Sequence, residues 1–205
     1  MPKLEIPRKA VYRLSLYYRA LQRLKANAVE TVSSAALSKA AGVKPTQLRK
    51  DLAYFGQLGT RGLGYSVAHL SKTLMEALGT ARLQPVVLIG VGHMGSALAR
   101  YRGFGKEGFE IVAGFDSDME RDRSDLGIPV QPMDELGAFI KERQIKLAIL
   151  TVPATVAQEV TNELVSGGIQ AILNFSPTIL QAPDGVVVNN VDLAIELENL
   201  SYFIR

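Results

Sequence analysis

Three glycines in the middle of the chain have the spacing of a loop that binds a diphosphate. They lie in the run Gly90, Val91, Gly92, His93, Met94 and Gly95. In a G-x-G-x-x-G loop the first glycine permits a tight turn and the second lets the backbone approach the phosphates. The third allows the next helix to pack closely on the preceding strand, with the diphosphate at the N-terminus of that helix. All six residues are therefore candidate ligand-binding residues.

An acidic residue follows the loop at the distance that a dinucleotide site requires. Asp116 ends an apolar run at residues 110 to 115, about 20 residues beyond the loop. A carboxylate there accepts hydrogen bonds from the adenosine ribose and repels a 2′-phosphate, so we expect NAD(H) in preference to NADP(H). Arg121 and Arg123 lie close enough in the sequence to weaken that preference. His93 is expected to face solvent as a spacer.

A second group of residues has the chemistry to contact DNA. Residues 45 to 55 fit a helix whose apolar face is Leu48, Leu52 and Phe55. The other face carries Thr46, Gln47, Arg49, Lys50 and Tyr54. Arg pairs with guanine and Gln with adenine in the major groove. The alternative is a helix whose polar face only meets water.

Arg61 stands alone among the glycines at positions 56, 59, 62 and 64. This pattern predicts a β-hairpin, or wing, with Arg61 at its tip, because glycine permits the positive φ angles of tight turns. An Arg on a slender tip fits a narrow, A·T-rich minor groove. The alternative is a flexible loop.

Basic and acidic side chains are distributed unevenly between the two parts of the chain that carry these candidate sites. Residues 1 to 80 hold 13 basic and 4 acidic side chains, whereas residues 81 to 205 hold 10 basic and 16 acidic ones. Phosphate neutralisation dominates the affinity of proteins for DNA, so only the first part suits that partner. A solvated basic surface without a partner remains the alternative.

The elements that carry these residues form two patterns. A winged helix-turn-helix domain is predicted at residues 1–79 from three features. They are helical spacing after Pro7, a short helix capped by Ser33 or Ser34, and the helix that begins at Pro45. From about Pro85 strands and helices alternate, which predicts a Rossmann-type α/β domain with a parallel sheet at residues 80–190. Ligands of such sheets bind at the carboxyl ends of the strands. The candidates at strand ends for the nicotinamide half of the site are Thr151, Val152, Pro153, Asn174, Phe175, Ser176 and Pro177. Tyr101, at the end of the first Rossmann helix, is a further candidate neighbour of the ring.

Residues 191–205 predict a C-terminal helix that is apolar on more than one side and capped by Asp192. Such a helix packs either on its own Rossmann core or, by exchange, on a partner subunit. The chain has no cysteine, so disulfides and Cys-ligated metals are excluded. We predict no metal, no catalytic residues and no membrane span, and we expect a cytoplasmic protein.

The quoted motifs closely resemble those of the Rex family of redox-sensing repressors over nearly the whole chain. They include Leu-Tyr-Tyr-Arg19, Arg-Lys-Asp51-Leu-Ala-Tyr-Phe-Gly56, Gly-Thr-Arg61-Gly-Leu-Gly-Tyr65, Leu-Thr-Val-Pro153, Ile-Leu-Asn-Phe175 and Asn-Val-Asp192. The resemblance implies a homodimer with an exchanged C-terminal helix, which would bind a palindromic double-stranded operator and leave it when NADH binds. NAD+ would be a weak competitor. The resemblance further implies a switch made of Arg19, Tyr101 and Asp192.

Two other functions fit parts of the pattern. A small NAD-dependent dehydrogenase would share the glycine loop, but it needs an acid or base and a substrate pocket, for which this chain leaves little room. A CoA-binding Rossmann module would share the fold, but Asp116 weighs against it. Binding tests with the two ligands distinguish NAD(H) from CoA.

Overall fold

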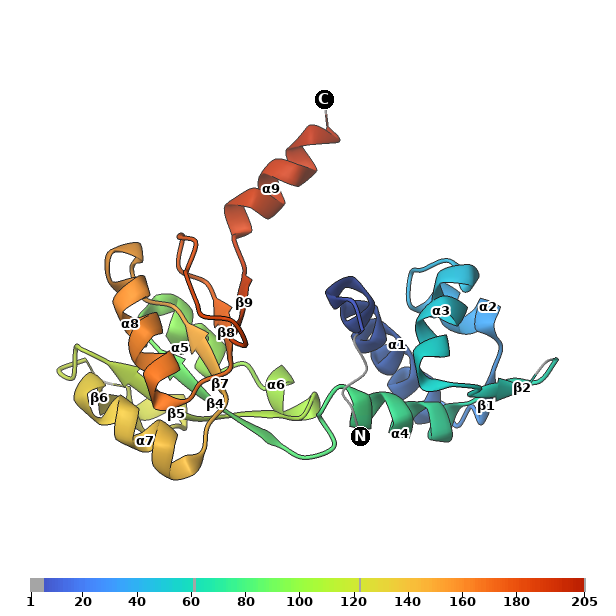
Figure 1. Ribbon diagram of the computed structural model, residues 1–205, viewed down its shortest axis with the longest axis horizontal. Helices are drawn as coiled ribbons and strands as arrows, with labels where there is room; N and C mark the ends of the chain where they lie inside the picture. The colour runs from blue at the N-terminus through green and yellow to red at the C-terminus, as the bar shows by residue number, and fades with distance from the viewer. Residues whose placement is uncertain (1–5, 61, 122, 205) are drawn as a thin grey trace. The chain divides into compact units, whose positions relative to one another are not determined.

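The computed structural model describes residues 6–60, 62–121 and 123–204. The chain forms two compact units, Met1–Arg82 and Leu83–Arg205, here called the N-terminal and C-terminal units (Figure 1). The sequence placed the boundary near Gly79. Each unit has its own apolar core, so each is described by itself.

The N-terminal unit contains the expected succession of helices. They are α1 (Arg8–Ala26), α2 (Ser34–Ala40), α3 (Pro45–Leu52), the 3-10 turn η1 (Ala53–Phe55) and α4 (Val67–Ala77). The Ser33 hydroxyl accepts the Ala36 N–H and so caps α2, and Gly42 follows that helix with φ of +69°. Pro45 occupies the first position of α3, where its missing N–H costs nothing.

The buried face of α1 agrees in part with the one that helical spacing predicts, which is Val11, Leu14, Tyr18, Leu21 and Leu24. Leu14 and Leu21 are buried, but Val11 is 40% exposed and Tyr18 is half-buried. The residues that face the core are Ala10, Leu14, Tyr17, Ala20 and Leu21. Tyr17 turns inward because its hydroxyl reaches a buried acceptor, the Asp51 carboxylate.

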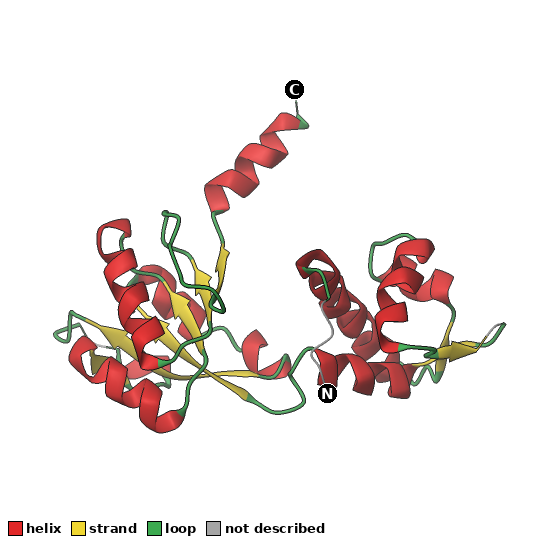
Figure 2. Ribbon diagram, in the orientation of Figure 1, coloured by secondary structure: helices red, strands yellow, loops and turns green. Residues whose placement is uncertain are grey.

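A small antiparallel sheet completes this unit (Figure 2). Its strands are β1 (Thr31–Val32), β3 (Gly64–Ser66) and β2 (Gly59–Thr60), in that spatial order. The β2–β3 pair is the predicted wing, and its tip residue Arg61 lies outside the described residues. Gly64 has φ of +88°, and a Cβ there would lie 2.3 Å from the Val32 carbonyl oxygen. Only glycine allows β1 and β3 to approach so closely.

The C-terminal unit is built on a parallel sheet. Its strands are β4 (Gln84–Ile89), β5 (Phe109–Asp116), β6 (Val130–Pro132), β7 (Leu147–Leu150), β8 (Ala171–Asn174) and β9 (Val187–Asn190). They are ordered β6-β5-β4-β7-β8-β9, and all adjacent pairs are parallel. The strand order reverses between β4 and β7, which is where open α/β sheets bind ligands.

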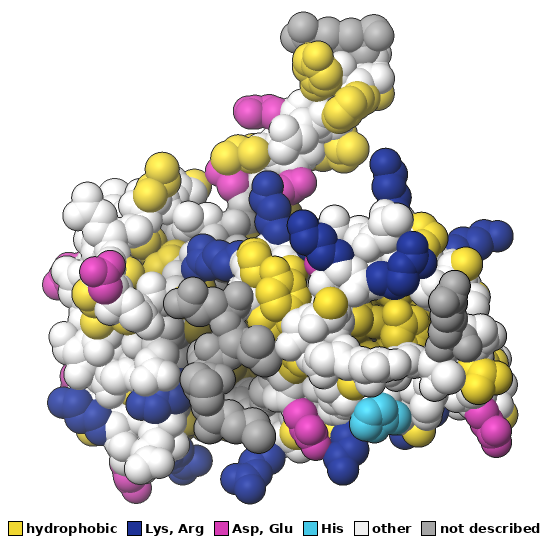
Figure 3. All heavy atoms as spheres, turned by 45° about the vertical axis from the view of Figure 1, so that its right-hand side comes forward, with side chains coloured by type: hydrophobic (Ala, Val, Ile, Leu, Met, Phe, Trp, Pro, Cys, Tyr) yellow, Lys and Arg dark blue, Asp and Glu magenta, His cyan; other side chains and the backbone are white. Residues whose placement is uncertain are grey.

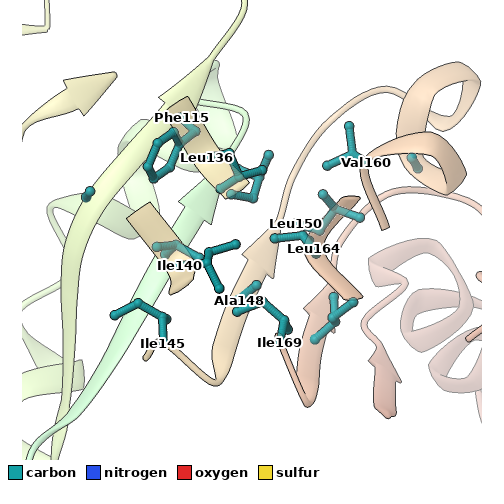
Figure 4. Packing of buried hydrophobic residues seen from close by; sticks show 14 of the residues in the cluster. Phe115, Leu136, Ile140, Ile145, Ala148, Leu150, Val160, Leu164 and Ile169 are labelled. Carbon is teal, nitrogen blue, oxygen red and sulfur yellow. The ribbon is translucent and has the colours of Figure 1, made fainter. Parts of the chain in front are cut away.

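Helices cover both faces of this sheet. They are α5 (His93–Ala99), α6 (Gly103–Lys106), α7 (Leu136–Arg143) and α8 (Ala154–Gly167), with 3-10 turns η2 (Ser124–Leu126) and η3 (Met133–Glu135). Leu136 and Ile140 of α7 pack with Leu164 of α8 against one face (Figure 4). Residues of α5 and α6 pack on the other face. The core therefore fixes the strand ends from which the candidate residues project.

The last element is α9 (Leu193–Tyr202). As predicted, the Asp192 carboxylate caps it by accepting the N–H groups of Ala194 and Ile195. No described residue of α9 is buried, and its apolar side chains are visible as yellow spheres on the uppermost element of Figure 3. Those exposed by more than half are Leu193, Ile195, Leu197, Leu200 and Tyr202. None of the described helices is both long enough and apolar enough to cross a membrane.

Candidate functional site

The glycine loop is locked against the end of β7. Gly90 has φ of +85°, and a Cβ there would lie 3.0 Å from the Thr151 backbone. A Cβ on Gly95 would lie 2.0 Å from the Gly90 carbonyl oxygen. The Thr151 hydroxyl donates to that same oxygen at 2.6 Å. The loop thus turns directly from β4 into α5, and no larger residue fits at positions 90 and 95.

The strand-end cleft lies in front of this loop and has a volume of about 800 Å³. The glycine loop and the ends of β5, β7 and β8 form it together with α8. Its lining includes Gly90, Gly92, Met94, Asp116, Ser117, Asp118, Arg121, Arg123, Met133, Thr151, Val152, Pro153, Val156, Glu159, Val160, Glu163, Phe175 and Pro177. This lining combines apolar side chains such as Val152 and Phe175 with charged ones such as Asp116, a mixture that suits a nucleotide.

Asp116 ties the glycine loop to the end of β5. One carboxylate oxygen accepts the Val91 N–H at 2.6 Å, and the other accepts the Asp118 N–H at 2.8 Å. The Arg123 guanidinium lies 3.0 Å from the same carboxylate, and the two side chains are only 6% and 14% exposed. Arg123 also donates to the carbonyl oxygens of Val91 and Asp118. The carboxylate is therefore both a loop anchor and half of a buried ion pair.

The part of the cleft lining that α8 supplies contains two acidic residues. Glu159 and Glu163 lie one turn apart on α8 and both line the cleft. Burial, together with the charge of Glu159, raises the pKa of Glu163 above its usual value. Two carboxylates repel phosphate, so this part of the cleft suits the uncharged parts of a nucleotide better than its diphosphate.

Asn174 holds the β8 end of the cleft in shape. Its amide nitrogen donates to the Thr178 carbonyl oxygen at 3.0 Å and to the Asn190 side chain at 2.9 Å. Its amide oxygen accepts the Ser176 N–H at 2.9 Å. These bonds fix the segment that carries Phe175 and Pro177 into the cleft.

The second candidate site lies on α3 and the wing. Arg49 and Lys50 are exposed, and the Arg49 guanidinium donates to the Ser34 hydroxyl at 3.2 Å. A groove of about 560 Å³ lies between α3 and the wing. It is lined by Ser33, Ser34, Arg49, Leu52, Ala53, Gly56, Gln57, Leu58, Gly59, Thr60, Gly62, Gly64 and Tyr65. A basic helix beside a glycine-rich hairpin is an arrangement suited to the major groove and its flank.

A buried carboxylate on the inner face of α3 joins this helix to α1. Asp51 is 1% exposed and accepts hydrogen bonds from Arg13 and Tyr17 of α1 and from Gln47 of α3. Burial raises the pKa of Asp51, but these hydrogen bonds outweigh burial and hold the pKa below its usual value. The cluster fixes the orientation of α3 on α1.

Comparisons with known proteins assign these features to a family. A family model described as "Putative DNA-binding protein N-terminus" matches residues 5–53, and one described as "CoA binding domain" matches residues 82–178. The chain is 44% identical over 205 residues to the redox-sensing transcriptional repressor Rex of Syntrophomonas wolfei, covering 100% of this chain and 98% of that protein. It is 43% identical over 206 residues to the repressor of the same name from Carboxydothermus hydrogenoformans, covering 100% and 99%.

The chain belongs to the Rex family of redox-sensing transcriptional repressors. Solved structures agree. The crystal structure of RSP in complex with beta-NAD+ and operator DNA matches with a TM-score of 0.90 and 35% identity over 97% of this chain and 92% of RSP. The complex of RSP with beta-NADH matches with a TM-score of 0.86 and 34% identity over 98% and 94%. The predicted Rex family, fold class and redox-sensing repressor function are confirmed.

The Rex fold brings most of the predicted cofactor residues together. Those that line the strand-end cleft are Gly90, Gly92, Met94, Asp116, Thr151, Val152, Pro153 and Phe175. The others are not among its described lining residues: Val91, Gly95 and Asn174 are buried, His93 is exposed, and Tyr101, which follows the C-terminal end of α5, is 60% exposed. The Tyr101 ring packs edge-on against Phe104, with 5.0 Å between ring centroids.

The predicted DNA and switch residues are distributed over both units of the Rex chain. Thr46, Arg49 and Lys50 are exposed on α3, whereas Gln47 and Tyr54 are half-buried. Arg19 lies on α1 in the N-terminal unit, and Asp192 lies in the C-terminal unit. Among the described residues, no group of three or more His, Asp or Glu side chains is placed to hold a metal ion.

Two of the ion pairs near these sites have particular weight for the Rex chain, and neither was predicted from the sequence. Sequence reasoning did not pair Arg13 with Asp51, although a lone acid beside Leu48 and Leu52 on the inner face of a helix was a usable signal. It treated Arg123 as a neighbour that weakens cofactor selectivity, whereas the structure pairs Arg123 directly with Asp116.

Proposed function

We propose that this Rex-family chain is a homodimer that represses transcription by binding a palindromic double-stranded operator and that leaves the operator when NADH binds. The main support for this proposal is that the two candidate sites lie in different compact units of one chain. A glycine-loop cleft occupies one compact unit, and an exposed basic helix with a wing occupies the other. RSP, which matches nearly the whole chain, has been crystallised with beta-NADH and with beta-NAD+ and operator DNA.

NAD(H) is the proposed regulatory ligand. Its diphosphate lies over the loop from Gly90 to Gly95, and its adenosine ribose lies near Asp116. The nicotinamide lies at the ends of β7 and β8, beside Thr151, Val152, Pro153, Asn174 and Phe175. Tyr101 is the further candidate for contact with the ring, which alone differs between NADH and NAD+. Cleft shape, the position of Asp116 and the apolar strand ends support this placement.

Operator DNA is the proposed partner of the N-terminal unit. Arg49 and Lys50 reach base edges or phosphates in the major groove, and Arg61 at the wing tip enters the minor groove. Thr46, Gln47 and Tyr54 complete the contact surface. Two observations support this assignment: Arg49 and Lys50 are exposed on α3, and the same unit contains the small sheet that forms the wing.

The C-terminal segment, residues 191–205, is proposed to be exchanged between subunits. Its helix α9 exposes apolar side chains that cost free energy in water. The sheet also has an apolar hollow of about 240 Å³, lined by Phe104, Ile111 and Leu173 among others. Within the dimer, Asp192 would pair with Arg19 in one state and with Tyr101 in the other, which couples NADH to DNA affinity.

We propose a regulatory, non-catalytic role in the cytoplasm, where operator DNA is found. None of the residues that line the described cleft is His, Lys or Tyr, the usual proton donors of dehydrogenases. CoA is a second candidate ligand, because residues 82–178 match a model described as a CoA-binding domain. Asp116, a ribose acceptor at the end of β5, favours NAD(H) over CoA.

A titration of a fluorescent palindromic operator tests the proposal. The full chain should bind without nucleotide, and NADH should release the DNA at concentrations at which NAD+ and CoA do not. Because the chain has no tryptophan, NADH fluorescence can be followed without energy transfer from indole. Release by CoA and not by NADH would overturn the ligand assignment, and equal binding to random DNA would overturn the operator assignment.

A further inference from the structure

The side chain of Gln47 is held in one orientation by the buried Asp51. The Gln47 amide nitrogen donates to Asp51 Oδ1 at 2.8 Å, one helical turn further along α3. The same carboxylate accepts Arg13 Nε at 2.6 Å, Arg13 Nη2 at 2.8 Å and the Tyr17 hydroxyl at 2.7 Å. Asp51 is 1% exposed, so water does not compete for these bonds.

The charge of Asp51 decides which way the amide faces. Burial raises the pKa of Asp51, but the hydrogen bonds from Arg13, Tyr17 and Gln47 hold it below its usual value, so the group is a carboxylate at neutral pH. An ionised carboxylate only accepts hydrogen bonds. Gln47 therefore turns its nitrogen toward Asp51, and its carbonyl oxygen is the amide atom that Asp51 does not engage.

Gln47 stands where a base contact would be made. It is the third residue of α3, between the exposed residues Thr46 and Arg49, and it is half-buried. The N-terminal half of a recognition helix is the part that meets base edges in the major groove. An amide free to turn reads adenine through both its oxygen and its nitrogen. Here the nitrogen faces Asp51.

We propose that Asp51 sets Gln47 as a hydrogen-bond acceptor, so that Gln47 reads an exocyclic amine, adenine N6 or cytosine N4, in the major groove. The proposal rests on the DNA-binding function proposed for α3. Guanine and thymine present only acceptors to the same position, and the oxygen of Gln47 would repel them. Asp51 is then a positioning residue that acts on base preference through Gln47 without touching DNA.

Chemically edited operators test the atom that Gln47 reads. In each half-site, every adenine is replaced in turn by purine and every cytosine by 2-pyrimidinone, which removes the exocyclic amine. At one base pair we expect the removal to weaken binding of the unaltered protein by about tenfold. It should leave the binding of Gln47→Met unchanged. Replacing the purine of that base pair by its 7-deaza analogue, which removes N7, should leave binding by the unaltered protein unchanged.

Asp51→Asn tests the positioning role. The new amide can donate to the Gln47 oxygen, so Gln47 can turn and present its nitrogen to the groove. We expect the amine dependence at that base pair to fall to less than threefold, with improved binding of guanine or thymine there. Tyr17→Phe is the matched control, because it removes one bond to the same carboxylate and leaves Gln47 and Arg13 in place. It should keep the original base preference.

The result at Gln47 stands even if Asp51→Asn fails to fold, since Gln47→Met leaves the buried ion pair intact. The proposal is overturned if no amine removal depends on Gln47, or if the Gln47-dependent atom is N7. If α3 does not bind the operator at all, the binding measurements would give a different result. In that case Arg49→Ala and Lys50→Ala would also leave operator binding unchanged.

Discussion

Arg13 of α1 and Asp51 of α3 form a two-pronged ion pair, with Nε donating to Oδ2 at 2.6 Å and Nη2 to Oδ1 at 2.8 Å. The carboxylate is almost completely buried, and the Arg13 side chain is 24% exposed. The two residues are 38 positions apart in the sequence. The pair therefore joins α1 to α3 in one orientation, which apolar packing alone defines less precisely.

Removing the cation should destabilise the N-terminal unit. Arg13→Ala leaves the charge of Asp51 buried with only Tyr17 and Gln47 as donors, and we expect the free energy of unfolding to fall by about 3 kcal/mol. Urea unfolding followed by circular dichroism measures it. Lys9→Ala, which removes an exposed cation from the same helix, is the control and should change little. Equal stability of the two variants would contradict the structural role of the pair.

The stability of this unit should depend on pH in acid. In the unfolded chain the Asp51 carboxyl has a pKa of about 3.9, and in the folded chain hydrogen bonds hold its pKa lower. The unfolded state therefore binds the proton first, so the stabilisation is full above about pH 4 and is lost as the pH falls through the folded pKa. Unfolding midpoints between pH 2 and 7 measure this loss. Asp51→Asn should lack it, and an unchanged profile in that variant would place the titrating group elsewhere.

Asp116→Ala should weaken NADH binding by about tenfold or more, because it removes both the ribose acceptor and the anchor of the Val91 N–H. Preference for NADH over NADPH should narrow, since the unpaired Arg123 would attract a 2′-phosphate. Fluorescence titration with both nucleotides measures the two effects. Asp125→Ala, which removes a carboxylate from the exposed pair with Arg100, is the control. Asp116→Ala with unchanged affinity and selectivity would disprove the ribose contact.

Arg49→Ala and Lys50→Ala should each weaken operator binding by about 1 to 3 kcal/mol. Both side chains are exposed on α3, so the fold should be unaffected. Gel shifts at fixed salt give the affinities, and NADH titration should give unaltered binding to the other unit. Lys72→Ala on α4 is the matched control for loss of an exposed cation. If all three variants bind the operator alike, α3 is not the recognition helix.

Asp192 caps α9, and a second role in the switch is proposed for its charge. Asp192→Ala removes the N-cap of α9, which costs about 1 kcal/mol, and removes the charge proposed for the switch. Asp192→Asn keeps a capping oxygen and removes only the charge. Both variants should bind NADH normally, yet NADH should no longer release the operator. Release by Asp192→Asn at the same NADH concentration as the unaltered chain would show that the charge is not part of the switch.

The sequence predicted those parts of the molecule that local patterns determine. One such part is the glycine loop, with the apolar strand before it and Asp116 after it. A tight turn, a close packing contact and a ribose contact each require a particular residue type at a particular position, so the motif has a recognisable spacing. Pro45 and Ser33 marked helix starts for the same local reason. Strands β1 and β6 were missed because two or three residues are too few to show a period.

Contacts between distant residues could not be predicted in this way. Arg13 and Asp51 are 38 residues apart, and no local rule pairs them. The inward turn of Tyr17 depends on that same buried carboxylate, so the helical spacing of α1 predicted Leu14 and Leu21 correctly but missed Tyr17. Asp116 was placed correctly at the end of β5, but its buried partner Arg123 follows from the course of an irregular loop.

The two units have separate cores, and this has a genetic consequence. A side chain at Gly95 would clash with the glycine loop, yet nothing in that clash touches the core built around Leu14, Leu37 and Leu48. Such an allele would silence its target genes permanently, regardless of the redox state of the cell. Lesions in the N-terminal core would instead leave those genes always expressed. Lesions in the glycine loop and lesions in the N-terminal core should therefore give opposite phenotypes.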